Sequence, residues 1–235
     1  MLVIGHRGAA SLAPENTMEA LQMGLESGAD ILEFDVRLTK DKIPVLIHDF
    51  HTIRTHHDVS FISRLTLADL ENNSKLAPII TLENVLDEFF GKIILNIELK
   101  GRGTAEIVFS LVKSHIKKTS DWDNIIFSSF KGSRLRIIRK LSKKARLALL
   151  HGQNPFIFIA YHRQLNLTAV GFHRLYINKL ALEIAKKAGI FTYAYTVNRP
   201  QTAVILAGQG IDGVVTDNPK AILKELFSER QDIHE

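Results

Sequence analysis

The chain has 235 residues, 46% of them hydrophobic and 23% charged, which is the ordinary composition of a globular protein with a sizeable core. It contains no cysteine, so a disulfide framework, a thiolate metal site and a thiol nucleophile are all excluded. The net charge of +5 favours an anionic partner such as nucleic acid, an acidic membrane or a phosphorylated small molecule.

Short β-rich runs alternate with helical patterns along nearly the whole chain. Eight runs predict strands, over residues 2–6, 31–37, 93–99, 124–129, 146–150, 168–172, 191–197 and 212–216. Another run, Pro44–His48, follows the second strand closely, and we expect it to be the hairpin partner or extension of that strand. Helical patterns separate the strands, over residues 15–28, 81–91, 105–118, 131–146, 154–164, 178–189, 199–210 and 218–227.

Strands separated by helices indicate parallel pairing, because parallel strands need crossover connections. An open doubly wound sheet and a (β/α)8 TIM barrel both satisfy this rule. Eight units and no glycine-rich dinucleotide turn favour the α/β barrel. The long polar stretch at 51–78 predicts a small insertion after strand 2, within one domain over residues 1–227. Residues 228–235 are polar and are expected to form a flexible tail.

The densest basic stretch is Lys131–Arg146. Its pattern predicts an amphipathic helix with Leu135, Ile138 and Leu141 facing inward and a solvated cationic outer face. No aromatic residues are interleaved for base stacking, so no nucleic acid partner is expected. No apolar run reaches membrane-spanning length, and the first is too short for a signal peptide, so we expect a cytoplasmic protein.

Ionisable residues gather at the predicted strand ends, where barrel enzymes carry their catalytic groups. These residues are His6, Arg7, Glu33, Asp35, His48, Asp49, Glu98 and Lys100. Glu33 and Asp35 are two residues apart on one strand and therefore face the same side, with Glu98 at matching height on the next strand. Hard oxygen ligands in this arrangement suit Mg²⁺ or Ca²⁺. A structural salt-bridge cluster with Arg37 and Lys100 explains the same spacing equally well.

Two histidines and two cations complete the predicted site. His6 and His48 are candidates for general acid and general base, because imidazole titrates near neutral pH, and the spacing does not say which is which. Arg7 and Lys100 are candidates for holding phosphate oxygens, for which the arginine fork is well shaped. With a metal ion, these groups predict electrostatic catalysis at phosphorus.

The motifs "HRG…PENT", "EFDVRLTKDKIPVLIHD", "IELK", "YTVN" and "GIDGVVTDNP" resemble the glycerophosphodiester phosphodiesterase family from about Val3 to Pro219. The resemblance implies a (β/α)8 barrel that hydrolyses a small-molecule glycerophosphodiester to sn-glycerol 3-phosphate and an alcohol such as choline or ethanolamine. It also implies a divalent cation on Glu33, Asp35 and Glu98, acid–base roles for His6 and His48, and phosphate contacts from Arg7 and Lys100. The implied nucleophile is water or a neighbouring glycerol hydroxyl.

The chain departs from the family pattern at two places. Tyr195 stands where the family commonly has tryptophan, and we expect its ring to pack against glycerol or a choline head group. His51, His56 and His57 lie in the predicted insertion, where a solvated polar loop is a better interpretation than a second metal site.

Two alternative functions remain open at this stage. One is a lysophospholipase D-type activity, which needs an apolar patch at the barrel mouth, and the residues expected to supply it are Phe50, Phe61, Ile62, Phe156 and Phe158. The other is a non-catalytic protein that binds a phosphate ligand or nucleic acid. The complete set of two histidines and three carboxylates argues against this second alternative.

Overall fold

The protein is described by a computed structural model over residues 1–52, 60–73 and 78–232. Eight parallel strands close into a barrel, because β1 pairs with both β2 and β9. Their bounds are β1 Leu2–Gly5, β2 Ile31–Leu38, β4 Ile94–Leu99, β5 Ile125–Ser129, β6 Arg146–His151, β7 Ala169–His173, β8 Phe191–Tyr195 and β9 Gly213–Thr216. The predicted (β/α)8 barrel is confirmed.

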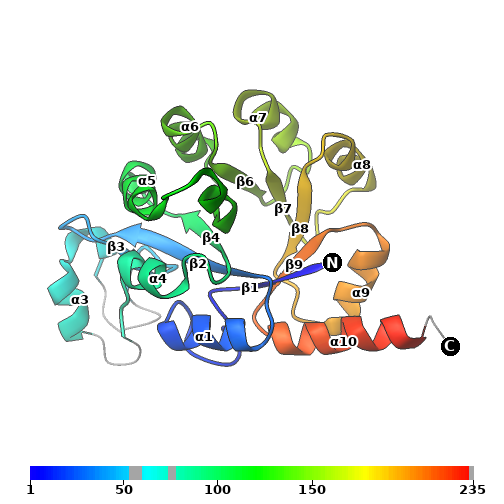
Figure 1. Ribbon diagram of the computed structural model, residues 1–235, viewed down its shortest axis with the longest axis horizontal. Coiled ribbons are helices and arrows are strands. Elements are labelled where there is room, and N and C mark those ends of the chain that lie inside the picture. Colours follow the sequence, from blue (N-terminus) through cyan, green and yellow to red (C-terminus); the bar gives the residue numbers. More distant parts are fainter. Residues whose placement is uncertain (53–59, 74–77, 233–235) are drawn as a thin grey trace.

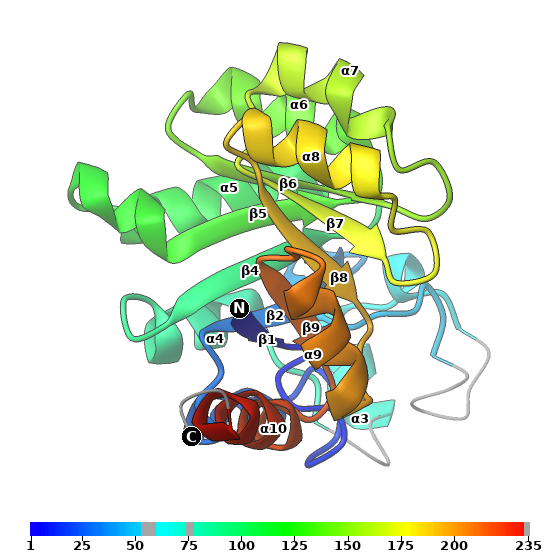
Figure 2. The ribbon, with the colours of Figure 1, turned by 90° about the vertical axis from the view of Figure 1, so that its right-hand side faces the viewer.

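The helices form a ring around the strands (Figure 1). They are α1 Met18–Glu26, α3 Leu67–Asn73, α4 Leu82–Phe89, α5 Thr104–His115, α6 Gly132–Leu141, α7 Ile157–Leu165, α8 Lys179–Lys187, α9 Pro200–Gly208 and α10 Pro219–Asp232. A short strand, β3 (Pro44–Leu46), pairs antiparallel with β2, so the predicted hairpin partner is confirmed. The tip of β7 and the loop after it lie at the right of Figure 2, and the start of the chain lies further left, toward the other end of the barrel.

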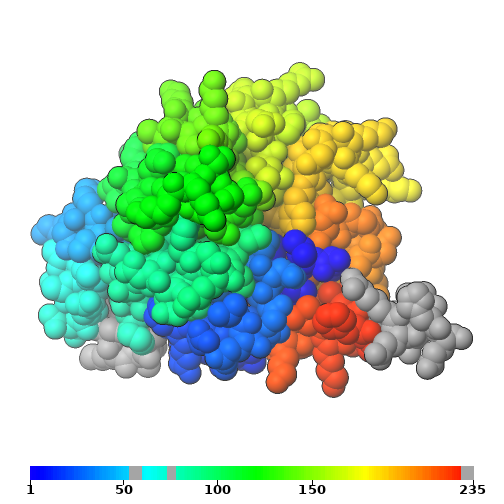
Figure 3. Space-filling view, viewed as in Figure 1, coloured from blue at the N-terminus to red at the C-terminus, as the bar shows by residue number. Residues whose placement is uncertain are grey.

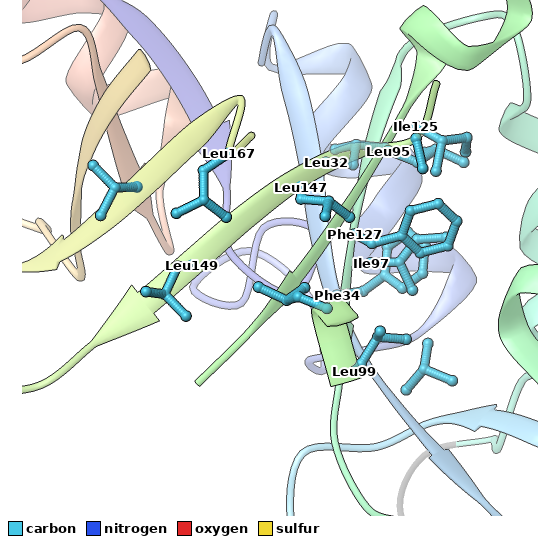
Figure 4. Close-up of a cluster of buried hydrophobic side chains, with 14 of the residues drawn as sticks. Leu32, Phe34, Leu95, Ile97, Leu99, Ile125, Phe127, Leu147, Leu149 and Leu167 are labelled. Atoms are coloured by element: carbon cyan, nitrogen blue, oxygen red, sulfur yellow. The ribbon is translucent and has the colours of Figure 1, made fainter. Parts of the chain in front are cut away.

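Alternation along each strand divides the hydrophobic side chains between the two faces of the barrel wall. Side chains such as Phe34, Ile97 and Phe127 point outward and pack under the helices as one buried cluster (Figure 4). A smaller buried cluster, which includes Ile4, Ala148 and Tyr193, lies on the inward face. Full burial of a large apolar side chain stabilises a fold by about 1.5–3 kcal/mol, so the outer cluster carries most of the stability.

Three predicted side-chain positions are wrong. Leu141 is the last residue of α6 and is 49% exposed, because the helix ends there and the side chain no longer faces a strand. Ile62 and Phe158 are each 1% exposed and do not lie at the mouth. Ile62 packs in a small buried cluster with Val45, and Phe158 packs edge-on against another ring.

The insertion after strand 2 contains regular structure in the part that is described. Its described part contains a 3₁₀ turn, Ile62–Arg64, followed by α3. The unusual histidines His56 and His57 lie outside the described residues. Helix α10 continues to Asp232, past the predicted domain boundary. Within the described ranges, no helix is long and apolar enough to cross a membrane.

Candidate active site

Three carboxylates converge at the C-terminal end of the barrel. β2 and β4 pair in parallel with Asp35 opposite Glu98, and Glu33 lies one inward-facing position below Asp35. One oxygen from each carboxylate lies within 4.8 Å of the others. Strand alternation produces this grouping, because the intervening Phe34 points outward into the main core.

Burial gives these carboxyl groups unequal proton affinities. Desolvation and the charge of Asp35 raise the pKa of Glu33 to about 7 and that of Glu98 to about 8. Burial also opposes ionisation of Asp35, but Lys100 and Arg7 overcome it and lower the pKa of Asp35. The cluster therefore binds protons near neutral pH, and a divalent cation between these oxygens would displace them.

Two cations balance the acidic cluster. Lys100 Nζ is 2.9 Å from Glu98 Oε1 and 3.2 Å from Asp35 Oδ1. The Arg7 side chain lies 3.3 Å from Asp35 and 2.8 Å from Glu15. Lys100 thus occupies the place that the salt-bridge interpretation predicts.

Arg37 does not occupy its expected place in that interpretation, because its Nε donates to the backbone oxygen of His48 at 2.9 Å. In this arrangement Arg37 fixes the segment that carries the second histidine. The ion pairs of the cluster are therefore made by Lys100 and Arg7.

His6, directly after β1, is paired with a carboxylate from the other end of the chain. Its Nδ1 lies 2.5 Å from Asp217 Oδ1, and Asn198 Nδ2 donates to the second oxygen of Asp217 at 2.5 Å. Burial opposes a charged imidazole here, but the Asp217 hydrogen bond and the charge of Glu33 together raise the pKa of His6. The arrangement orients the ring so that Nε2 remains for chemistry.

His48 has a different environment. Its Nδ1 lies 2.7 Å from Asp49 Oδ1, so this imidazole is also oriented by a carboxylate. Burial is the largest influence on His48 and lowers its pKa, although the charge of Asp35 acts in the opposite direction. The two histidines thus have shifted proton affinities of opposite sign.

A strained turn places Arg7 over the carboxylates. Arg7 and Asn16 adopt left-handed backbone conformations, with φ of 51° and 58°, and the Arg7 amide donates to Glu33 Oε2 at 3.0 Å. Gly8 has a φ of 89°, and a Cβ there would lie 2.4 Å from the backbone of Ala20. Only glycine fits at this close approach.

Three polar residues position the site although no role was predicted for them. Asn16 donates from Nδ2 to Asp35 Oδ2 and accepts from the Asp35 amide, both at 3.1 Å. The other two are Asp217 and Asn198. All three belong to motifs that carry the family resemblance, so those motifs could have pointed to them as site residues.

The far side of the mouth is lined by aromatic and uncharged side chains. A cavity of about 40 Å³ lies between His6, Glu33 and Glu98 on one side and Phe130 and Tyr195 on the other. The Tyr195 hydroxyl donates to the backbone oxygen of His151 at 2.6 Å, which leaves the ring at the cavity wall.

The cavity floor is polar. Asn96 Oδ1 and Ser128 Oγ are buried there, and neither has a hydrogen-bond partner among the described residues. Buried polar atoms of this kind usually meet a partner in the working protein. A ligand with hydroxyl groups fits this floor.

The expected site residues therefore come together from five strand ends or the loops after them. Glu33, Asp35, Glu98, Arg7 and Lys100 form one cluster of carboxylates and cations. His6 lines the same cavity as Glu33 and Glu98. The charge of Asp35 acts on His48, and Tyr195 closes the opposite wall. Ser129, at the end of β5, has a structural role, because its hydroxyl donates to the Leu99 carbonyl at 3.0 Å.

Comparison with known proteins identifies relatives over nearly the whole chain. The sequence profile of the Glycerophosphoryl diester phosphodiesterase family matches residues 6–221. YhdW of Bacillus subtilis is 34% identical over 239 residues, covering 96% of this chain and 98% of that protein. A glycerophosphodiester phosphodiesterase of Caldanaerobacter subterraneus is 32% identical over 239 residues, with 94% and 96% covered.

A solved structure adds a ligand to this comparison. The Oleispira antarctica phosphodiesterase OLEI02445, in complex with the product sn-glycerol-3-phosphate, superposes with a TM-score of 0.85. It is 27% identical to this chain, and 96% of each chain is covered.

Proposed function

Since the chain belongs to the glycerophosphoryl diester phosphodiesterase family and is thus a phosphoric diester hydrolase, we propose that it cleaves glycerophosphodiesters to sn-glycerol 3-phosphate and an alcohol. The observation that carries this proposal is the convergence of three buried carboxylates with two histidines, each oriented by its own carboxylate. A protein that only bound phosphate would have no use for two oriented imidazoles.

Glu33, Asp35 and Glu98 would hold a divalent cation, Mg²⁺ or Ca²⁺. The donor set fits such a cation, because it offers three hard oxygens within 4.8 Å of one another. The carboxyl groups are also buried, which raises the pKa of Glu33 and of Glu98. When bound, the cation would neutralise charge that develops on the phosphoryl oxygens.

Arg7 and Lys100 would bind the anionic phosphodiester. Both lie against Asp35 at the mouth and are 15% exposed, so their charges border the cavity. The arginine fork suits two phosphate oxygens and the lysine a single one. Tyr195 would contact the glycerol or alcohol portion through its ring, since its hydroxyl is already engaged.

The opposite pKa shifts of the histidines suggest their division of labour. His48, whose pKa is lowered, would accept the proton of the attacking hydroxyl as a new phosphorus–oxygen bond forms. His6, whose pKa is raised, would donate a proton to the alcohol oxygen as its bond to phosphorus breaks. The attacking oxygen belongs to water or to a neighbouring glycerol hydroxyl, and only the second route passes through a cyclic phosphate.

The first experiment measures glycerol 3-phosphate release from a panel of glycerophosphodiesters with Mg²⁺, Ca²⁺ or EDTA. We expect metal-dependent release that is lost in His6→Ala and in Glu33→Ala. Trapping a cyclic glycerol phosphate would identify the glycerol hydroxyl as nucleophile. Absence of release with every metal and every diester would overturn the proposal.

Lysophospholipids are a second candidate substrate class. Phe50 and Phe61 stack at 5.9 Å and are 56% and 42% exposed in the segment that follows His48, and Phe156 is also exposed. This apolar surface is smaller than predicted, because Ile62 and Phe158 are buried. Including lysophospholipids in the substrate panel tests whether this surface serves a lipid substrate. If Phe50→Ser reduces turnover of lysophospholipids and leaves soluble diesters unaffected, the apolar surface serves a lipid substrate.

A further inference from the structure

Positive charge is concentrated in one segment of the chain. Residues 113–146 contain eleven lysines and arginines against two aspartates, a net charge of +9, so all other residues together carry −4. The chain as a whole therefore owes its basic character to this segment. Such an asymmetry indicates a surface that meets a polyanion.

The fold brings both ends of that segment together. A groove of about 470 Å³ separates the end of α5 from the α6–β6 connection, and Lys113, Lys117 and Lys118 face Lys144 and Leu141 across it. Lys144 Nζ lies 3.0 Å from Thr119 Oγ1, which ties the two sides. We call the surface formed by these four lysines and the adjacent Lys143 the lysine face. In Figure 3 the green part of the chain, to which this segment belongs, lies at the surface.

The lysine face lies at the opposite end of the barrel from the catalytic residues. It consists of connections that lead into β5 and β6, at the N-terminal ends of the strands. The carboxylates and histidines lie at the C-terminal ends. Any partner of this face therefore leaves the mouth open.

The charges of the lysine face are not cancelled locally. Asp121 is capped by the backbone amides of Lys117 and Lys118, and Asp123 pairs with Arg146 at 2.6 Å. In the part of the chain that the structure describes, no carboxylate lies within 4 Å of the five lysine ammonium groups. The helix dipole accounts for Lys113 in the last turn of α5, but the other four lysines lie beyond the helix ends.

We propose that the lysine face docks the protein on an anionic phospholipid bilayer. Lysines are flexible point charges that suit a diffuse layer of head groups. Leu141, 49% exposed among them, adds an apolar contact at the interface. Docking in this orientation would point the mouth away from the bilayer, toward water-soluble substrate.

A nucleic acid fits the same face less well. Arg139 donates to four backbone carbonyls and Arg146 is paired, so neither fork is available for phosphate. Trp122 is 5% exposed and lies beneath Lys113, so no ring is presented for base stacking. Lysine charge with one exposed leucine favours a membrane.

The test is flotation of the full chain with vesicles of neutral phosphatidylcholine, with or without 30 mol% phosphatidylglycerol. We expect binding only to anionic vesicles and release at high salt. Each lysine near an anionic bilayer strengthens binding about fivefold, so Lys143→Glu/Lys144→Glu should weaken it at least about 25-fold. Lys220→Glu/Lys224→Glu on α10 makes the same charge change at exposed positions elsewhere and should bind as the parent does.

The outcomes separate this inference from the proposed function. Phosphodiester turnover in solution should be the same in both double variants, which also shows that each is folded. Equal binding by the two variants, binding to neutral vesicles, or no binding at low salt would overturn the proposal. So would full displacement from anionic vesicles by duplex DNA at an equal phosphate concentration, because the face would then prefer nucleic acid.

Discussion

The two walls of the barrel mouth keep their side chains inside the protein by different means. On the wall of β1, β2 and β4, buried Glu33, Asp35 and Glu98 are held by ion pairs and hydrogen bonds. On the wall of β6 and β8, Leu150 and Tyr195 are held by packing and a backbone hydrogen bond. The first wall therefore stores unfavourable desolvation and repulsion that only function explains, whereas the second stabilises the fold directly.

Neutralising one carboxylate should give the sharpest separation of the two roles. We expect Glu33→Gln to reduce turnover at least about a thousandfold, because a cation ligand supplies several kcal/mol of charge stabilisation in the transition state. The same variant should unfold at a higher temperature than the parent in EDTA, since a buried repulsion with Asp35 is removed. Turnover assays and thermal melts measure the two effects.

The matched control is Leu150→Ala on the opposite wall. Leu150 is 7% exposed, so its truncation should lower the melting temperature whether or not metal is present. If Glu33→Gln melts below the parent in EDTA, the acidic wall contributes to stability and the comparison fails.

Replacing either histidine should reduce turnover by about a hundredfold to ten-thousandfold, the usual contribution of a positioned acid or base. The pH profiles should differ. A base must be deprotonated, so His48→Ala should remove the limb in which the rate rises from acid pH. An acid must be protonated, so His6→Ala should remove the limb in which the rate falls at alkaline pH. Loss of the opposite limb in each variant would reverse the assignment.

Period-two alternation was sufficient to predict that the three carboxylates converge. It places Glu33 and Asp35 on the inner face and Phe34 on the outer face, and the parallel register of β2 and β4 then brings Glu98 alongside. The eight strands follow from apolar runs and crossover helices for the same reason. Local sequence determines these features, so local sequence predicts them.

Features that depend on closure of the ring could not be predicted by pattern alone. Asp217 meets His6 because β1 and β9 pair with Gly5 opposite Thr216, a contact between the two ends of the chain. Leu141 fits an apolar stripe, but the exact end of α6 leaves it exposed. The spacing of Lys100 is compatible with both phosphate binding and ion pairing, and the fold pairs it with Asp35 and Glu98.

A prediction for stability concerns His151, the last residue of β6, which is 5% exposed. Burial lowers the pKa of His151 to about 4, below the value of about 6.5 expected when the chain is unfolded. The unfolded state then binds the extra proton between these pH values, so stability is complete above pH 6.5 and falls on acidification. The loss approaches about 3 kcal/mol near pH 4.

Substitution of His151 by leucine should flatten this acid limb. Unfolding free energies from denaturant titration at pH 7 and pH 4.5 measure the change. Phe172→Leu alters the ring that packs edge-on against His151 at 4.7 Å without removing a titratable group, so it should lower both values equally. Parallel pH dependence in the parent and His151→Leu would show that His151 is not the source.

The smallest expected effects come from the carboxylates that orient the two histidines. Asp217→Asn should reduce turnover at the pH optimum only about tenfold to a hundredfold, as loss of an orienting partner usually does. The hydrogen bond that His6 Nδ1 donates to Asp217 helps to raise the pKa of His6 against burial, so its loss should move the alkaline limb to lower pH. Asp49→Asn should instead move the acid limb to lower pH, since Asp49 opposes the burial that lowers the pKa of His48. Because each substitution acts on one limb, a variant that shifted both limbs equally would show that the two histidines titrate as one unit.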